Sequence, residues 1–116
     1  MTIKIGVTLS VEGLHNFPIV ESMFGEEVSY LKYPHRHNFI IKCEQLVTHT
    51  NRDEEFICLK HRIIEFLKQK YYDCVHKLYN FESMSCEMIA NELVEHFKLC
   101  RCEVSEDGEN YAIIEK

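Results

Sequence analysis

The sequence lacks several features that would assign the chain to common classes of protein. No run within its 116 residues approaches the roughly 18 apolar residues of a membrane span, so we expect no membrane partner. The first residues lack the charged-then-apolar layout of a signal peptide, which predicts a cytoplasmic protein. Acidic residues outnumber basic ones, 19 to 13, and this balance argues against a broad basic surface for a nucleic acid polymer.

Low-complexity tracts, internal repeats and linkers are absent as well. The length lies near the commonest domain size, and 46% of the residues are apolar, so residues 1–116 are expected to form one domain with its own core. Six cysteines would suggest a disulfide framework in a secreted chain. Because the sequence shows no secretory signal, free and mostly buried thiols are the favoured interpretation.

Hydrophobic periodicity predicts an α+β fold. Residues 2–12 and 34–49 alternate with period two, as strands with one buried face do. The period changes to 3.6 from about Asp53, and again from about Ser85 to Leu99, which indicates two amphipathic helices. Two short apolar runs flank Asp107-Gly108 and predict a final hairpin.

The expected order is therefore strand, strand, helix, helix, strand, strand (ββααββ). A four-stranded antiparallel sheet with the two helices packed on one face is the economical arrangement of these elements. Such a small sheet leaves its edges unpaired, and long free edges promote association unless they are covered or closed. We therefore expect a homo-oligomer that joins sheet edges into a barrel.

Three histidines form the most informative pattern. His35 and His37 are two positions apart on a predicted strand, so their side chains leave the same face. If the alternation of the first strand continues past Val11, His15 lies on the corresponding face. Three nitrogen ligands and one open position are the pattern of catalytic zinc. Spacing alone leaves the metal open, because a His-x-His pair in a strand is more often two surface or hydrogen-bonded histidines.

Short motifs in order along the chain add to this pattern. They are Glu12 to Asn16, Pro34 to Phe39 (similar to His-Gly-His-Asn-Tyr), Glu55 to Lys60 (similar to Asp-Phe-x-x-Leu-Lys), His76 to Asn80, Ser85 to Ala90 (similar to Thr-x-Glu-x-x-Ala), and Glu106. Together they resemble the 6-pyruvoyl- and 6-carboxy-tetrahydropterin synthase family, whose members have the tunnelling fold. The resemblance runs in order over nearly the whole chain.

The resemblance implies a set of site residues. It implies a Zn²⁺ cofactor held by His15, His35 and His37. It also implies a catalytic role for His76, and a ligand-binding role for Glu106, which would grip a small pterin or purine-like ring. In that family zinc coordinates a dihydroneopterin triphosphate substrate, a cysteine helped by an Asp–His pair moves a proton, and triphosphate leaves. The subunits commonly assemble as hexamers of two trimers, with the site between subunits.

Two positions depart from the family pattern. Leu31 stands where the family has its catalytic cysteine, and Val75 stands where it has the aspartate before the catalytic histidine. Some relatives use a glutamate in place of the cysteine, but Glu26 and Glu27 are out of place for it. Asp73 lies two positions from Val75 and could reach the histidine, although it is on the wrong register. Because general acid–base catalysis contributes about 10²–10⁴-fold, these losses should cripple the usual reaction.

Three functions stay open at this point. In the first, the chain is a zinc-dependent lyase that acts on a dihydroneopterin triphosphate-like substrate with a changed set of acid–base residues around His76. Alternatively, it is a non-catalytic tunnelling-fold protein that sequesters a pterin, purine or nucleotide, or a scaffold that zinc only stabilises. Leu31 and Val75 favour sequestration, whereas metal ligands that leave a position open favour the enzyme.

Overall fold

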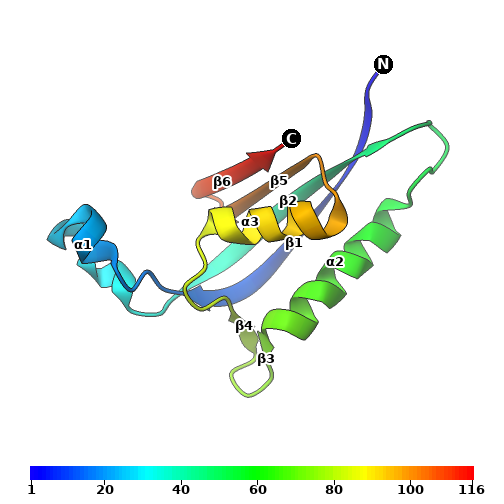
Figure 1. Cartoon of the computed structure of the whole chain (residues 1–116). Helices are drawn as coiled ribbons and strands as arrows, with labels where there is room; N and C mark the ends of the chain where they lie inside the picture. The colour runs from blue at the N-terminus through cyan, green and yellow to red at the C-terminus, as the bar shows by residue number, and fades with distance from the viewer.

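The computed structural model describes all 116 residues and shows a mixed α+β fold with extents of 52 × 33 × 21 Å (Figure 1). Strands β1 (Ile3–His15) and β2 (His35–Val47) form a long antiparallel pair. Strand β5 (Arg101–Glu106) pairs with β2, and β6 (Asn110–Glu115) pairs with β5. The four expected strands and the final hairpin are therefore present.

The sheet has six strands, so the expected number of four is wrong. The segment between the long helices forms β3 (Tyr72–Asp73) and β4 (Leu78–Asn80), and the sheet order is β3-β4-β1-β2-β5-β6. Strand β4 runs parallel to β1 and pairs with it at Gly13 and Leu14. Strands this short contain too few residues to produce a recognisable alternation, so the sequence pattern missed them.

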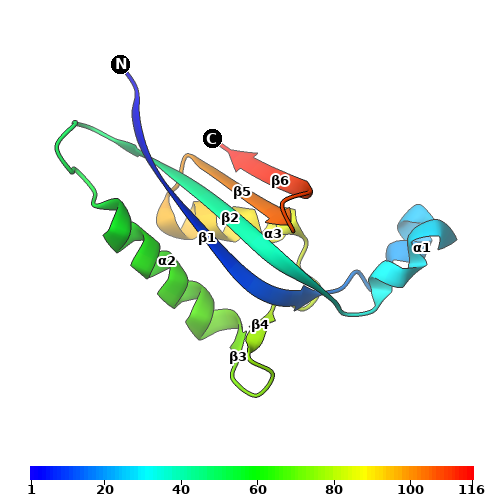
Figure 2. The ribbon, with the colours of Figure 1, turned by 180° about the vertical axis from the view of Figure 1, so that it is seen from behind.

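Helices α2 (Phe56–Tyr71) and α3 (Cys86–Phe97) cover one face of the sheet, as expected (Figure 1), and the other face is uncovered (Figure 2). The expected start of the first helix is wrong by three residues, because the Glu55 carboxylate caps the helix by accepting the Ile57 N–H at 3.1 Å. Helix α3 has the expected cap, since Ser85 Oγ accepts the Met88 N–H at 3.1 Å.

The connection between β1 and β2 is more structured than a loop. It contains helix α1 (Val20–Phe24) and the 3₁₀ helix η1 (Glu26–Lys32), which together form an arm that projects beyond one end of the sheet (Figures 1 and 2). The Phe17 N–H donates to the Leu31 carbonyl at 2.8 Å and ties the two ends of the arm together. We call residues 17–33 the α1–η1 arm.

The core lies between the covered face and the two long helices. Alternate strand residues and one stripe of each helix build it, including Val7, Leu9, Val11, Phe39, Ile41, Cys43, Leu59, Ile63, Leu67, Ile89, Leu93, Cys102 and Val104. All six cysteines are free; Cys58 and Cys74 are exposed, and the others are buried or half-buried. No helix has the length and apolar character needed to cross a membrane.

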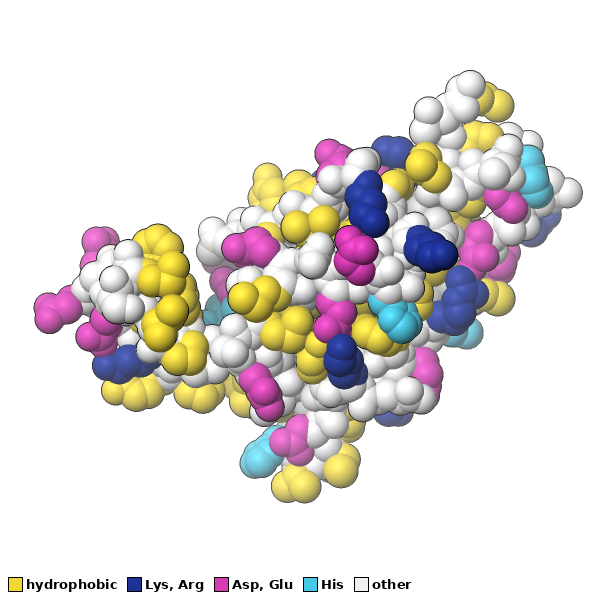
Figure 3. All heavy atoms as spheres, in the orientation of Figure 1, with side chains coloured by type: hydrophobic (Ala, Val, Ile, Leu, Met, Phe, Trp, Pro, Cys, Tyr) yellow, Lys and Arg dark blue, Asp and Glu magenta, His cyan; other side chains and the backbone are white.

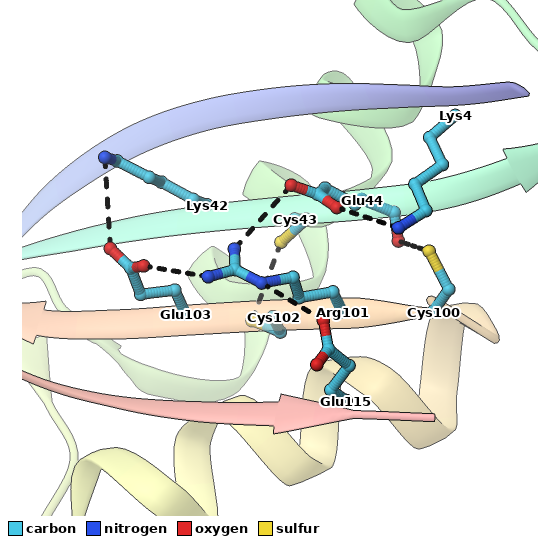
Figure 4. A network of polar contacts seen from close by, with 9 residues as sticks. All are labelled: Lys4, Lys42, Cys43, Glu44, Cys100, Arg101, Cys102, Glu103 and Glu115. Carbon is cyan, nitrogen blue, oxygen red and sulfur yellow. Dashed lines mark hydrogen bonds and ion pairs between the residues drawn. The ribbon is translucent and has the colours of Figure 1, made fainter.

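The uncovered face is polar and centres on Arg101. Its guanidinium nitrogens lie 3.6 Å from Glu44, 3.2 Å from Glu103 and 3.5 Å from Glu115, one carboxylate on each of three strands (Figure 4). Because side chains alternate along β5, the neighbouring Cys102 points to the opposite face, into the core. The same alternation places the side chains of Val104 and Glu106 on the covered face as well.

Candidate metal centre

Three histidines meet at one end of the covered face. His15 is the last residue of β1 and pairs directly with His35, the first residue of β2, while His37 follows two positions later. Strand alternation places all three on the face that also carries Val11 and Phe39. Their ring centroids are 4.5 Å (His15–His35), 5.4 Å (His15–His37) and 5.0 Å (His35–His37) apart. The structure thus brings together the three histidines that the spacing singled out.

A carboxylate from a third strand joins this cluster. Glu106 is the last residue of β5 and pairs with Phe39, which directs its side chain to the same face as the histidines. Its Oε2 atom lies 2.8 Å from His15 Nε2 and 3.6 Å from His37 Nε2. One donor atom from Glu106 and from each of the three histidines lies within 4.8 Å of the others. The resemblance implied a ligand-binding role for Glu106, but spacing along the sequence gave no sign that it joins the histidines.

Each ring of the cluster is held through its Nδ1 atom. Each Nδ1 donates to an oxygen that only accepts: His15 to the Met84 carbonyl at 2.9 Å, His35 to the Tyr33 carbonyl at 2.9 Å, and His37 to Asp107 Oδ2 at 2.8 Å. These partners assign the hydrogen to Nδ1 and leave a lone pair on each Nε2. Metal-binding histidines are oriented by such outer hydrogen bonds, which fix the tautomer and the direction of the ligand nitrogen.

Asp107, which the sequence places in the turn of the final hairpin, also belongs to the site. Its second oxygen accepts the Asn38 N–H at 2.8 Å, so one carboxylate connects β2 to the hairpin turn and to the ring of His37. The hydrogen bond from Asn38 and then that from His37 lower the pKa of Asp107. The carboxylate is therefore ionised at neutral pH, which suits a partner of a metal-bound imidazole.

His15 is the most buried of the three histidines, with 7% of its surface exposed. Burial lowers its pKa, and the hydrogen bond to Met84 and the charge of Glu106 only partly oppose this effect. Its Nε2 atom is buried and makes no hydrogen bond, although Glu106 is close. A buried lone pair without a hydrogen, beside further nitrogen and carboxylate donors, fits a bound zinc-type cation.

A pocket of about 570 Å³ opens beside the cluster. Its walls come from the α1–η1 arm, from residues 83–88 at the start of α3, and from the β5–β6 hairpin, and His15, His35 and Glu106 lie at its base. Figure 3 shows hydrophobic side chains along the side of the arm that faces the body of the molecule. Leu31 is part of this wall, whereas the exposed Glu26 and Glu27 are not.

Cys86, the first residue of α3, supplies the only thiol in the pocket wall. Burial, with smaller effects from Glu106 and Glu87, raises its pKa to about 12. The thiol is therefore protonated at neutral pH and is a poor substitute for a catalytic thiolate. Neither Leu31 nor Cys86 offers the pocket a thiolate base.

His76 lies apart from the cluster, in the turn between β3 and β4, and it is not part of the pocket wall. This turn projects from the body of the protein (Figure 1), and the His76 side chain is 71% exposed. Its Nδ1 donates to Asp73 Oδ2 at 2.8 Å. Asp73 thus reaches His76 although it lies two positions away from Val75, because the turn folds back on itself.

Comparison with known proteins gives a result for the fold. No family model matches the sequence, and no curated protein matches it. Solved structures of 6-pyruvoyl tetrahydropterin synthases do match. The Caenorhabditis elegans protein has a TM-score of 0.69 at 12% identity, covering 100% of this chain and 96% of its own. The Plasmodium vivax protein has a TM-score of 0.65 at 16% identity, and the match covers 100% of this chain and 98% of its own.

The Plasmodium falciparum protein is similar too, with a TM-score of 0.61 at 15% identity and coverage of 99% of this chain and 98% of its own. These matches span the whole chain, including the arm and the short strands. Identities this low carry an argument about the fold alone. The chain therefore has the fold of the 6-pyruvoyl tetrahydropterin synthases, the tunnelling fold that the sequence motifs implied.

Proposed function

We propose that the chain is a zinc-dependent, tetrahydropterin synthase-like protein that binds a dihydroneopterin triphosphate-like substrate at the histidine cluster and acts on it as a lyase. One observation carries the proposal. Three imidazoles, each held through Nδ1 by an oxygen acceptor, keep their Nε2 lone pairs free in one small volume beside a pocket. When bound there, zinc supplies a Lewis acid that polarises a ligand oxygen and acidifies the neighbouring proton.

The pocket suits a small ligand with a flat ring and polar edges. Its volume lies within the roughly 300–1,000 Å³ usual for such sites, and its walls are largely apolar with a few polar groups. Phe17, Phe24 and Leu31 offer apolar surface for a ring, while Asn16 and Glu106 offer polar groups. A carboxylate such as Glu106 can accept two N–H donors from a pterin or guanine edge.

The pair of Asp73 and His76 is the proposed acid–base group. It lies outside this chain's own pocket, so it would serve a site completed by another subunit. Free sheet edges support such an assembly, because β6 pairs only with β5, and β1 has a partner on its outer side only at Gly13 and Leu14. We propose a homo-oligomer of the hexameric kind that the resemblance implies.

A second candidate function is sequestration of a pterin, purine or nucleotide without turnover. The observation in its favour is Leu31, an apolar side chain in the pocket wall where the family places its catalytic cysteine. Without a base there, the pocket and the metal would bind a ligand and leave its carbon–hydrogen bonds intact.

One experiment separates these functions. The purified protein is assayed for zinc per chain and then incubated with dihydroneopterin triphosphate while triphosphate release is followed. The lyase predicts bound zinc and release, with loss of release but not of zinc in His76→Ala. The exposed His61 provides a matched control, and His61→Ala should change neither quantity. Zinc and bound ligand without release would establish sequestration, and absence of histidine-dependent zinc would contradict both functions.

A further inference from the structure

We infer that Glu106 is a fourth ligand of the metal, so that the ligand-free centre is closed by three imidazoles and one carboxylate and has to open before a substrate reaches the metal. This inference rests on the metal centre of the proposed function. It adds to that function a resident carboxylate that competes with the incoming ligand.

The contact between Glu106 and His15 carries the inference. The hydrogen of the His15 ring is on Nδ1, where it bonds to the Met84 carbonyl, so Nε2 carries a lone pair. This atom faces the carboxylate Oε2 at 2.8 Å, yet the two form no hydrogen bond, and Nε2 is otherwise without a partner. Two electron-rich atoms this close repel each other unless a positive charge, a proton or a metal cation, lies within reach of both.

A second histidine repeats this relation. Glu106 Oε2 lies 3.6 Å from His37 Nε2, whose ring hydrogen is likewise occupied, here by Asp107. One carboxylate oxygen therefore faces two free nitrogen lone pairs. An oxygen at this position completes a set of four protein donors, and four protein ligands leave none of the open positions that catalytic zinc sites keep.

The backbone holds Glu106 in this place. It ends β5 opposite Phe39, and the next residue is fastened to β2 twice: the Asp107 N–H donates to the Asn38 carbonyl at 2.9 Å, and the Asp107 carboxylate accepts the Asn38 N–H. The end of the hairpin is thus pinned beside the histidines. With the backbone held, the carboxylate moves by rotation of its own side chain, and the pocket that it lines offers the space.

The two roles of Glu106 exclude each other. A carboxylate bound to the metal cannot at the same time accept two N–H donors from a ring in the pocket. A ligand that uses both the metal and Glu106 would therefore replace the carboxylate oxygen at the metal with an oxygen of its own, and the released carboxylate would accept the N–H donors of the ring. Binding of the ring edge by Glu106 and release of a coordination position at the metal would then occur together.

The test uses the full-length protein loaded with cobalt(II) in place of zinc, because the visible spectrum of cobalt reports its ligands. Thiocyanate serves as the probe, since it binds the metal only where a position is open or held by water. We expect the spectrum of the wild-type protein to resist thiocyanate. Glu106→Gln and Glu106→Asp, which remove the charge or withdraw the carboxylate by one methylene, should admit it at least about tenfold more readily. Glu109→Gln, on the exposed hairpin turn, is the matched control and should behave as wild type.

Zinc affinity, measured by competition with a chelator, is the second readout. Loss of Glu106 should weaken it by more than the ~10–100-fold that outer partners of metal ligands contribute. Equal thiocyanate uptake and equal zinc affinity in wild type and Glu106→Gln would overturn the inference while leaving the metal centre intact. Wild-type thiocyanate uptake and zinc affinity in Glu106→Asp would also overturn the inference. A negative charge near the metal, without direct contact, would then be enough to explain both readouts. Failure of the wild-type chain to bind metal through its histidines would instead refute the proposed function itself.

Discussion

Two places in the molecule hold a histidine by the same bond but in opposite surroundings. At the histidine cluster the ring of His37 donates through Nδ1 to Asp107, and at the β3–β4 turn the ring of His76 donates through Nδ1 to Asp73, each at 2.8 Å. The His37 side chain is 21% exposed, and that of His76 is 71% exposed. An oriented imidazole therefore indicates a metal ligand only where several such imidazoles converge.

The difference follows from the elements that carry the two pairs. Paired strands repeat every two residues and bring imidazoles from neighbouring strands to one spot, whereas a four-residue turn can place only one ring beside its own carboxylate. Convergence produces a set of donors for an ion. Isolation leaves the ring of His76 exposed, as the proposed acid–base role at a site completed by another subunit requires.

Removal of one converging ring should have the largest effect. We expect His35→Ala to weaken zinc binding by more than ~100-fold, since losing a ligand costs more than losing an outer partner. The comparison is His76→Ala, which should leave zinc binding unchanged. Both are measured as zinc per chain after dialysis against a graded series of chelator concentrations. Equal zinc loss in the two variants would contradict the distinction drawn between the sites.

The two carboxylates provide a second comparison of matched variants. Asp107→Asn leaves one amide oxygen for two donors, the His37 ring and the Asn38 N–H, so one of these bonds is lost. We expect zinc affinity to fall by about 10–100-fold. Asp73→Asn makes the equivalent change at the turn and should leave zinc affinity unchanged. Both affinities are measured by competition with a chelator. An unchanged zinc affinity in Asp107→Asn would show that the hydrogen bond from His37 Nδ1 to Asp107 does not contribute to metal binding.

The sequence predicted the part of the centre that depends on local repetition. His35 and His37 share a face because side chains alternate, and His15 joins them because the same alternation runs to the end of β1. The motifs added the tunnelling fold, which the structural neighbours bear out. Glu106 and Asp107 reach the cluster through the register between β5 and β2, a pairing across more than sixty residues that no local pattern encodes.

Other features were missed because they are too short or depend on turn geometry. Strands of two and three residues and a helix of five show no period. Along the chain, Asp73 lies two positions before Val75, where the family has its aspartate. In the folded turn its carboxylate accepts the backbone N–H groups of Val75 and His76 as well as the His76 ring, so distance along the sequence was a poor guide to reach.

Gly13 lies between the histidine cluster and the β3–β4 turn, since it pairs with His37 on one side and with Tyr79 on the other. Its substitution should have a moderate effect on stability. A Cβ atom there would lie 2.9 Å from the Tyr79 carbonyl of β4 and 3.1 Å from the ring of Phe39 beneath the histidines. We expect Gly13→Ala to lower the free energy of unfolding by about 1–3 kcal/mol, the usual cost of overpacking. In Gly6→Ala, on the same strand, the nearest atom is 3.4 Å away, so its effect should be small. Urea unfolding in excess chelator measures both without a contribution from metal, and equal effects would contradict the close packing at Gly13.

The smallest expected effect concerns the titration of Asp73. The hydrogen bond from the His76 ring is the first cause that lowers the pKa of Asp73, and the His76 and Val75 N–H groups add to it. A carboxyl whose folded-state pKa is lowered stabilises the fold above its unfolded pKa, and this contribution is lost as the pH falls through the folded value. His76→Ala removes the ring but keeps both N–H groups, so the pKa of Asp73 should rise only part of the way to its ordinary range. The loss of stability in acid should be correspondingly smaller. Carboxyl carbon NMR of the two proteins follows the titration directly, and an unchanged Asp73 would mean that the ring and the carboxylate do not pair in solution, leaving the turn without its proposed acid–base group.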